Sequence, residues 1–222
     1  MSRERAEAGM VTIRTFTERD RPKLHALYAR AAVGSPSGSL WGHDESEAAI
    51  YLKPYMDLEP GSLFLAIENG RVVGYLAGCL DSAAFPSEVA RVDQAIRRYR
   101  PFLRPRSAKF FARSLADLAW ATVRRAPVAG DFHDARWPAH LHINVIPEAR
   151  GTGAADRLMD HWLERVCGHG AGGCHLQTVA ENTRAVRFFK RKGFVEHGPA
   201  PVIPGLRYQG RRVHQRTMVW NP

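Results

Sequence analysis

A glycine-bearing segment of the chain has the residue types needed to hold a phosphate group. The segment is PEARGTGAADRL, residues 147–158, in which Arg150 precedes Gly151 and Gly153. The first backbone amides of a helix lack partners inside the helix, and together with the helix dipole they attract anions. Glycine lets a phosphate approach the backbone closely, and the two alanines that follow leave that approach open. By itself, however, a pair of glycines fits a plain strand-to-helix turn better than a phosphate site.

Two familiar nucleotide-binding patterns are absent from this segment. It contains no GxxxxGK[ST], and Asp156 stands where the third glycine of GxGxxG would be. We therefore expect neither a P-loop nor a dinucleotide site here.

Histidines close to this segment could accept or donate a proton. His140 and His142 are two residues apart in a predicted strand, so they share the face opposite its apolar residues. A histidine with a pKa near neutrality is a plausible general base. For each histidine alone, an ordinary position on a half-buried strand explains the residue better. Asp81 and the pair His133-Asp134 are weaker candidates for the same role.

The elements that must position these residues follow from periodicity and turn signals. Two apolar runs flank Asn69-Gly70, which predicts a β-hairpin. The strand–helix–strand unit over 141–179 should form a right-handed parallel crossover. The fold class expected is α/β, in the sense of a mixed, mostly antiparallel sheet of about seven strands flanked by helices. Strands are expected at 11–16, 62–68, 71–80, 141–146, 174–179, 194–198 and 212–220, and helices at 20–33, 45–56 (broken near Pro54), 151–170 and 181–192.

Length and composition predict one domain with an extra helical segment. The chain has 222 residues, of which 45% are hydrophobic and 24% charged, as is usual for a globular protein. We expect a disordered tail over 1–10 and a single domain over 11–222. Helical spacing between about 81 and 139 indicates an insertion, since connections between such strands are usually far shorter.

Charge and cysteine content exclude several classes of protein. The net charge is +10, and arginines cluster between 91 and 136, but no nucleic-acid-binding motif accompanies them, so we do not expect a nucleic-acid reader. No apolar run reaches the ~18 residues of a membrane span, and the polar start lacks a secretory signal. Three cysteines without a CxxC pair predict neither disulfides nor a metal site, and a reducing cytoplasm is the expected location.

A joint pattern over residues 141–198 carries a family resemblance. Arg150-Gly151-Thr152-Gly153-Ala154-Ala155 fits R/Q-x-x-G-x-G/A, and it follows a strand that ends V-x-P. About 30 residues later, N-x-x-A-x-x-F-F-x-x-x-G-F spans Asn182 to Phe194. The chain here resembles the GCN5-related N-acetyltransferase (GNAT) family. More loosely, YLKPYMDLEPGSLFLAIENGRVVGYLAG and the helical piece after it look like the acetyltransferase-like domain attached to some O-GlcNAc hydrolases and its bacterial relatives.

The resemblance implies a cofactor, acetyl-coenzyme A, and a place for it. In the family the pyrophosphate lies on the amides of the glycine-bearing turn, and the pantetheine arm pairs with the preceding strand. That strand and the next one splay apart to form the cofactor cleft. The implied cofactor contacts are Ile143, Asn144, Val145, Arg150, Gly151, Thr152, Gly153, Ala154, Ala155, Asn182 and Phe189.

The sequence departs from the family at the positions that usually handle protons. Phe189 replaces a tyrosine that many relatives use to protonate the leaving thiolate, and Gln177 replaces a glutamate that several use as a base. The expected function is an acetyl-coenzyme A-dependent N-acetyltransferase in which a primary amine attacks the thioester directly in a ternary complex, with His142 or His140 as candidate base. The alternative is a module that binds acetyl-coenzyme A with little or no transfer.

The acceptor amine is open at this level, and it could be a small molecule or a protein. The 81–139 insertion either covers the acceptor cleft or makes a subunit contact, which would give a homodimer. The loop with Trp41 either lines the acceptor side or holds an ordinary packed tryptophan.

Overall fold

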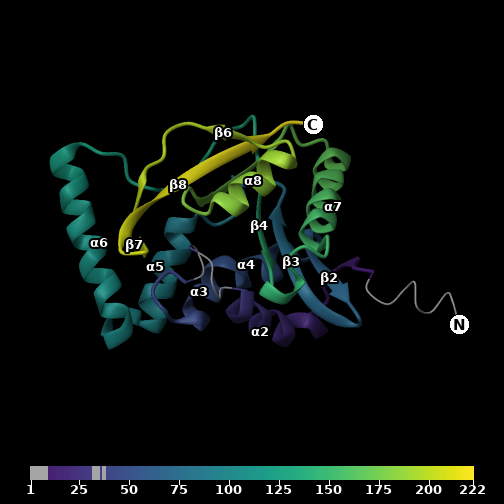
Figure 1. Cartoon of the computed structure of the whole chain (residues 1–222), viewed down its shortest axis with the longest axis horizontal. Coiled ribbons are helices and arrows are strands. Elements are labelled where there is room, and N and C mark those ends of the chain that lie inside the picture. The colour runs from purple at the N-terminus through teal and green to yellow at the C-terminus, as the bar shows by residue number, and fades with distance from the viewer. Residues whose placement is uncertain (1–9, 32–35, 37–38) are drawn as a thin grey trace, which may run out of the picture.

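The computed structural model describes residues 10–31, 36 and 39–222. Within them, eight strands form a mixed sheet in the order β1-β2-β3-β4-β5-β8-β6, and β7 pairs with β8 beside that path (Figure 1). Residues 1–9 of the expected tail lie outside the described part. The strands are β1 Thr12–Thr15, β2 Leu63–Glu68, β3 Arg71–Cys79, β4 Ala139–Val145, β5 Cys174–Val179, β6 Val195–His197, β7 Val202–Tyr208 and β8 Arg211–Trp220.

Helices cover the sheet and one of them projects from its edge. α2 and α7 both pack against β3 and β4, whereas α6 packs on β7 at the far end of the molecule (Figure 1). None of the described helices combines the length and apolarity that a membrane span requires. The helices are α2 Arg21–Ala31, α3 Asp44–Tyr51, α4 Lys53–Leu58, α5 Glu88–Tyr99, α6 Pro105–Arg124, α7 Ala154–His169 and α8 Thr183–Arg191, with 3₁₀ turns η1 Glu18–Asp20, η2 Pro60–Ser62, η3 Pro101–Leu103 and η4 Pro147–Ala149.

The predicted hairpin joins β2 and β3, and its turn has the backbone that the sequence requires. Asn69 and Gly70 both have positive φ, 50° and 72°, as an Asn-Gly hairpin turn needs. β3 continues the antiparallel half of the sheet by pairing with β4 without a register shift, from Cys79↔His140 to Gly74↔Val145. The ladder with β3 therefore holds one edge of β4 in place.

The parallel pair β4–β5 separates soon after it begins. The two strands pair only at Ala139↔Cys174 and His140↔His175, so the rest of β4 has no ladder on its β5 side. α7 forms the crossover between them and buries an apolar face that includes Trp162. The helix lies so close to the sheet that a Cβ at Gly78 would be 2.2 Å from the Trp162 ring.

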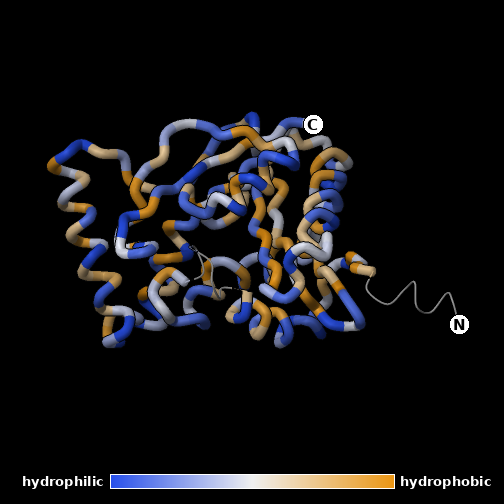
Figure 2. Tube along the Cα trace, viewed as in Figure 1, coloured by the Kyte–Doolittle hydropathy of each residue, from blue (hydrophilic) through white to orange (hydrophobic). Residues whose placement is uncertain are grey.

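Many residues of the main hydrophobic core come from the strands of the sheet. Most residues of α8 are hydrophilic (Figure 2). The expected fold class, with its mostly antiparallel sheet and single splayed parallel pair, is confirmed. The segment between β3 and β4, expected to be a helical insertion, contains α5, η3 and α6 followed by a long loop.

One detail agrees with the sequence expectation and one differs from it. The break expected near Pro54 in the helix over 45–56 lies at Leu52, where α3 ends and α4 begins. β7 was not expected, because Pro204 and Gly205 interrupt its apolar pattern. Gly205 has a φ of 80°, and its amide donates to the Asp117 carboxylate of α6 at 2.9 Å. Contacts with a distant helix, rather than local propensity, therefore hold this strand.

Candidate active site

A large cleft opens where β4 and β5 separate. Its volume is about 830 Å³, and its walls come from β4, β5, the turn before α7, the face of α8 and the start of α5. Because β4 has no partner strand along this edge, its backbone groups can pair with an extended ligand. The splayed pair that the sequence predicted therefore does form a cleft.

The glycine-bearing turn forms one end of this cleft. Gly151 and Gly153 have positive φ, 88° and 85°, and a Cβ at either would meet no atom within 4 Å. Gly153 is the residue before the first turn of α7, and no side chain caps that helix end. The first amides of a 16-residue helix are thus open to an anion from the cleft side.

Arginines add positive charge to the lining of this cleft. Arg150 lines the cleft together with three arginines of α8, which are Arg184, Arg187 and Arg191. Burial, and the nearby charge of Arg184, lower the pKa of Arg150. Both effects mean that an anion placed between these guanidinium groups would be stabilised by them.

The expected cofactor contacts on β4 and α8 lie along the cleft. Ile143, Asn144 and Val145 all line it, and the Asn144 amide donates to the Tyr75 hydroxyl at 2.9 Å. Asn182 also lines the cleft while it caps α8, since its Oδ1 accepts from an amide at 3.3 Å. Phe189 lines the cleft and is 6% exposed. Thr152 and Ala154 are the two expected contacts that are not part of the lining; the first is exposed and the second buried.

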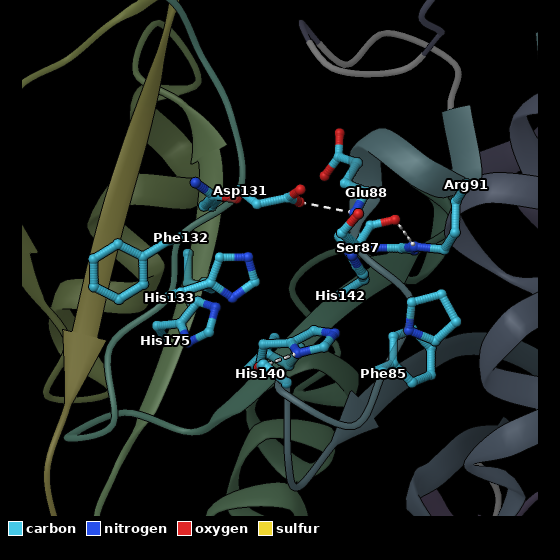
Figure 3. Close-up of a pocket in the computed structure, with 15 residues that line it drawn as sticks. Phe85, Ser87, Glu88, Arg91, Asp131, Phe132, His133, His140, His142 and His175 are labelled. Carbon is cyan, nitrogen blue, oxygen red and sulfur yellow. Dashed lines mark hydrogen bonds between the residues drawn. The ribbon is translucent and has the colours of Figure 1, made fainter. Parts of the chain in front are cut away.

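A smaller pocket of about 50 Å³ adjoins the cleft. It lies between the start of α5, the loop before β4, and the middle of β4 and β5 (Figure 3). The two cavities share six lining residues, which places them side by side: Glu88, Asp131, Leu141, His142, Leu176 and Gln177.

The two candidate histidines have different surroundings. His140 has both ring nitrogens engaged, Nε2 with the Tyr55 hydroxyl at 2.8 Å and Nδ1 with the Ser82 hydroxyl at 2.7 Å. His142 lines both cavities and lies edge-on to the rings of Tyr51 and Tyr55. Burial lowers the pKa of His140 well below its ordinary value and lowers the pKa of His142 to about 3. Both imidazoles are therefore neutral at pH 7, and a catalytic role for either stays a prediction.

The weaker candidates from the sequence lie apart from the shared lining. The Asp81 carboxylate accepts from the Ala83 amide at 2.9 Å, which makes it part of a turn. His133 lines only the small pocket, and Asp134 pairs with Arg136 at 2.7 Å.

The Trp41 side chain does not line either cavity. It is 4% exposed, packs against Phe110 and Phe111, and donates from Nε1 to Ser46. Of the two sequence readings, the ordinary packed tryptophan is the one that the structure supports.

Sequence reasoning did not select Glu88, which the structure places where the cavities meet. It lies in the first turn of α5, inside the insertion, directly after the capping residue Ser87. An acidic residue in a first helical turn is common, so local sequence offers no signal that separates this one from others. Gln177 on β5 also belongs to the shared lining, and its Nε2 donates to the Gly130 carbonyl at 2.9 Å.

The fold is similar to several solved structures. One is SsHAT, with a TM-score of 0.58, 21% identity, and coverage of 94% of this chain and 98% of that chain. A second is a ribosomal-protein-alanine N-acetyltransferase from Brucella melitensis, with a TM-score of 0.57, 17% identity, and coverage of 95% and 99%. A third is a putative acetyltransferase from Salmonella typhimurium, solved with its cofactor acetyl-CoA, with a TM-score of 0.57, 14% identity, and coverage of 95% and 93%.

The sequence itself also matches a family model. The model describes the acetyltransferase (GNAT) family, and the match extends over residues 24–194. This range contains the splayed strands, the glycine-bearing turn and α8, which together form the cleft. The chain therefore belongs to the GNAT acetyltransferase family.

Proposed function

We propose that this protein is an N-acetyltransferase that takes its acetyl group from acetyl-coenzyme A and gives it to a primary amine. The observation that carries the proposal is the glycine-bearing turn, with its open helix end and the neighbouring charges of Arg150 and Arg184, at one end of an 830 Å³ cleft. A molecule with a pyrophosphate at one end and a long arm behind it fits this arrangement of charge and shape. When bound, the cofactor would supply a thioester, which carries both the acetyl group and its leaving thiol.

The residues present fit such a cofactor. The amides of Gly151, Gly153 and Ala155 and the guanidinium of Arg150 would hold the pyrophosphate, because these residues line the same end of the cleft. The free edge of β4 over Ile143–Val145 would pair with the pantetheine arm, and Asn182 and Phe189 would line the opposite wall.

Direct attack by the amine is supported by the way the two cavities adjoin. A cofactor in the large cleft and an amine in the small pocket would meet at the shared lining, so both can be bound together. None of the three cysteines of the described chain lines either cavity, which argues against a cysteine acyl-enzyme. His142, which faces both cavities, is the histidine that we propose contacts the reacting groups.

Two measurements test the proposal in sequence. Calorimetry with coenzyme A should show binding that weakens as salt rises, since a polyanion is held by arginines. Release of coenzyme A from acetyl-coenzyme A is then followed over a panel of primary amines. Absence of binding at millimolar coenzyme A would refute the cofactor assignment.

A binding module without transfer is the second candidate, favoured by Gln177 and Phe189, neither of which can act as an acid or base. Tight binding without amine-dependent thiol release over the whole panel would support it. Thiol release that depends on an amine would exclude it.

A further inference from the structure

The site lacks the proton acceptors expected from its family, and the structure supplies another. Of the residues shared by the two cavities, only Glu88 and Asp131 carry carboxylates. Both belong to the segment between β3 and β4. Figure 3 shows Asp131 pointing from its loop toward the start of α5, where Glu88 lies.

Asp131 is occupied as a helix cap. Its Oδ1 accepts from the Glu88 amide at 2.8 Å and its Oδ2 accepts from the Val89 amide at 3.4 Å. These bonds satisfy two of the amides at the start of α5, which otherwise have no partner. Asp131 therefore fixes the position of the Glu88 backbone and has its own oxygens engaged.

Glu88 has one oxygen anchored and one available. Its Oε1 accepts from the Tyr51 hydroxyl at 2.8 Å. Among the described residues, no hydrogen-bond donor reaches its Oε2. A carboxylate held through one oxygen and open at the other, at the wall of a pocket, has the geometry of a proton acceptor.

The surroundings of Glu88 strengthen it as a base. Burial raises the pKa of Glu88, Tyr51 and Arg91 lower it, and Asp131 raises it. His142 on β4 also faces this place, but it is neutral because its own pKa is lowered to about 3. A carboxylate with a raised pKa holds a proton more firmly, so it is a stronger base than an ordinary carboxylate.

We propose that Glu88 is the general base of the reaction, an inference that rests on the proposed acetyl transfer. The acceptor enters as a primary ammonium group, and Glu88 takes one of its protons. The amine nitrogen then forms a bond to the acetyl carbonyl carbon, the carbon–sulfur bond breaks, and the thiolate leaves with the bonding electrons. The new amide nitrogen loses its extra proton, which neutralises the thiolate, and Glu88 later releases its proton to solvent. The products are an N-acetyl amine, a thiol and one proton.

This role belongs to Glu88 rather than to the residues around it. His140 has both nitrogens engaged, and Gln177 has no basic group. Asp131 is committed to the helix start. His142, with a pKa near 3, is a much weaker base than a carboxylate whose pKa is raised.

The test compares Glu88→Gln with Asp93→Asn, an exposed acid on the same helix that pairs with Arg97. Amine-dependent thiol release by Glu88→Gln should fall about 100-fold in kcat/KM, as is typical when a general base is lost. Asp93→Asn should keep the wild-type rate. Coenzyme A binding by calorimetry and the unfolding temperature should be close to wild type in both variants. Equal rates in the wild type and Glu88→Gln would overturn the proposal.

Tyr51→Phe provides a readout that a merely structural role would not move. Removing the hydroxyl takes away a bond that stabilises the ionised Glu88, so the pKa of Glu88 should rise. The acid limb of the kcat/KM profile should then move to higher pH. An unmoved limb would contradict the role of Glu88.

A measurement without cofactor or amine separates this inference from the proposed function. In protein labelled with ¹³C at the glutamate carboxyls, NMR titration should show one signal with a raised pKa that Glu88→Gln removes and Tyr51→Phe shifts upward. If Glu88 titrates in the ordinary range, the base assignment fails even if acetyl-coenzyme A binds. If coenzyme A does not bind to the wild type, the proposed function fails, but the titration still reports the pKa of Glu88.

Discussion

Replacing Gly153 with alanine tests whether the turn before α7 is shaped for a ligand. Gly153 has a φ of 85°, in the left-handed region, and a Cβ there would meet no protein atom within 4 Å. The substitution therefore introduces backbone strain but no clash. The left-handed conformation costs an alanine roughly 1–2 kcal/mol, so the unfolding temperature should fall by about 2–8 °C at this chain length.

Gly70 provides the matched control because it has the same backbone requirement far from the cleft. Its φ is 72°, a Cβ there would also meet nothing within 4 Å, and it lies in the β2–β3 turn. Gly70→Ala should therefore lose a similar amount of stability, measured by denaturant unfolding. It should bind coenzyme A as the wild type does.

The affinity for coenzyme A should distinguish the two variants. A methyl group on Gly153 keeps a phosphate from approaching the loop amides, and the loss of one hydrogen bond to a charged group is about 1.5–3 kcal/mol. That corresponds to a roughly 10- to 100-fold weaker Kd by calorimetry for Gly153→Ala. Equal affinity in the Gly153→Ala and Gly70→Ala proteins, at equal stability, would refute the assignment of the turn to the pyrophosphate.

Three further changes test other parts of the structure. Asp117→Asn removes the fully buried carboxylate that pairs with Arg207 and Arg212. The free energy of unfolding should fall by about 2–3 kcal/mol. This loss is smaller than for a fully buried ion pair, because both arginines are partly exposed. The pKa of Asp117 is lowered in the folded protein, so the wild type should lose this stability as pH falls below about 4, whereas the variant should not. If the free energy of unfolding changes with pH in the same way in both proteins, the pairing is contradicted. Arg184→Gln should weaken coenzyme A binding about fivefold, or roughly 1 kcal/mol, with a difference that fades at high salt. His142→Gln should leave the acid limb of the pH–rate profile in place, because a pKa near 3 keeps the ring neutral, and a moved limb would identify the histidine as the base.

Much of the fold could be predicted because its signals are local. The Asn69-Gly70 turn, the β5 strand over Cys174–Val179 and the glycine-bounded α7 all depend on residues that are neighbours in sequence. β7 could not be predicted, since a proline and Gly205 hide a strand that α6 stabilises from about 90 residues away. The break between α3 and α4, by contrast, was predictable, because Pro54 lies in the first turn of α4.

The candidate site divides in the same way. The glycine-bearing end of the cleft was predictable because the positive φ of such a turn and the helix start after it depend on consecutive residues. The small pocket was not, since it forms only when α5 and the loop before β4 meet the splayed strands. The sequence by itself therefore determined the family pattern, the turn and the strand on which His142 lies. Only the tertiary structure brought Glu88 from the insertion beside Asp131, Tyr51 and the cleft, because proton chemistry depends on distances and burial that residues far apart in the chain create together.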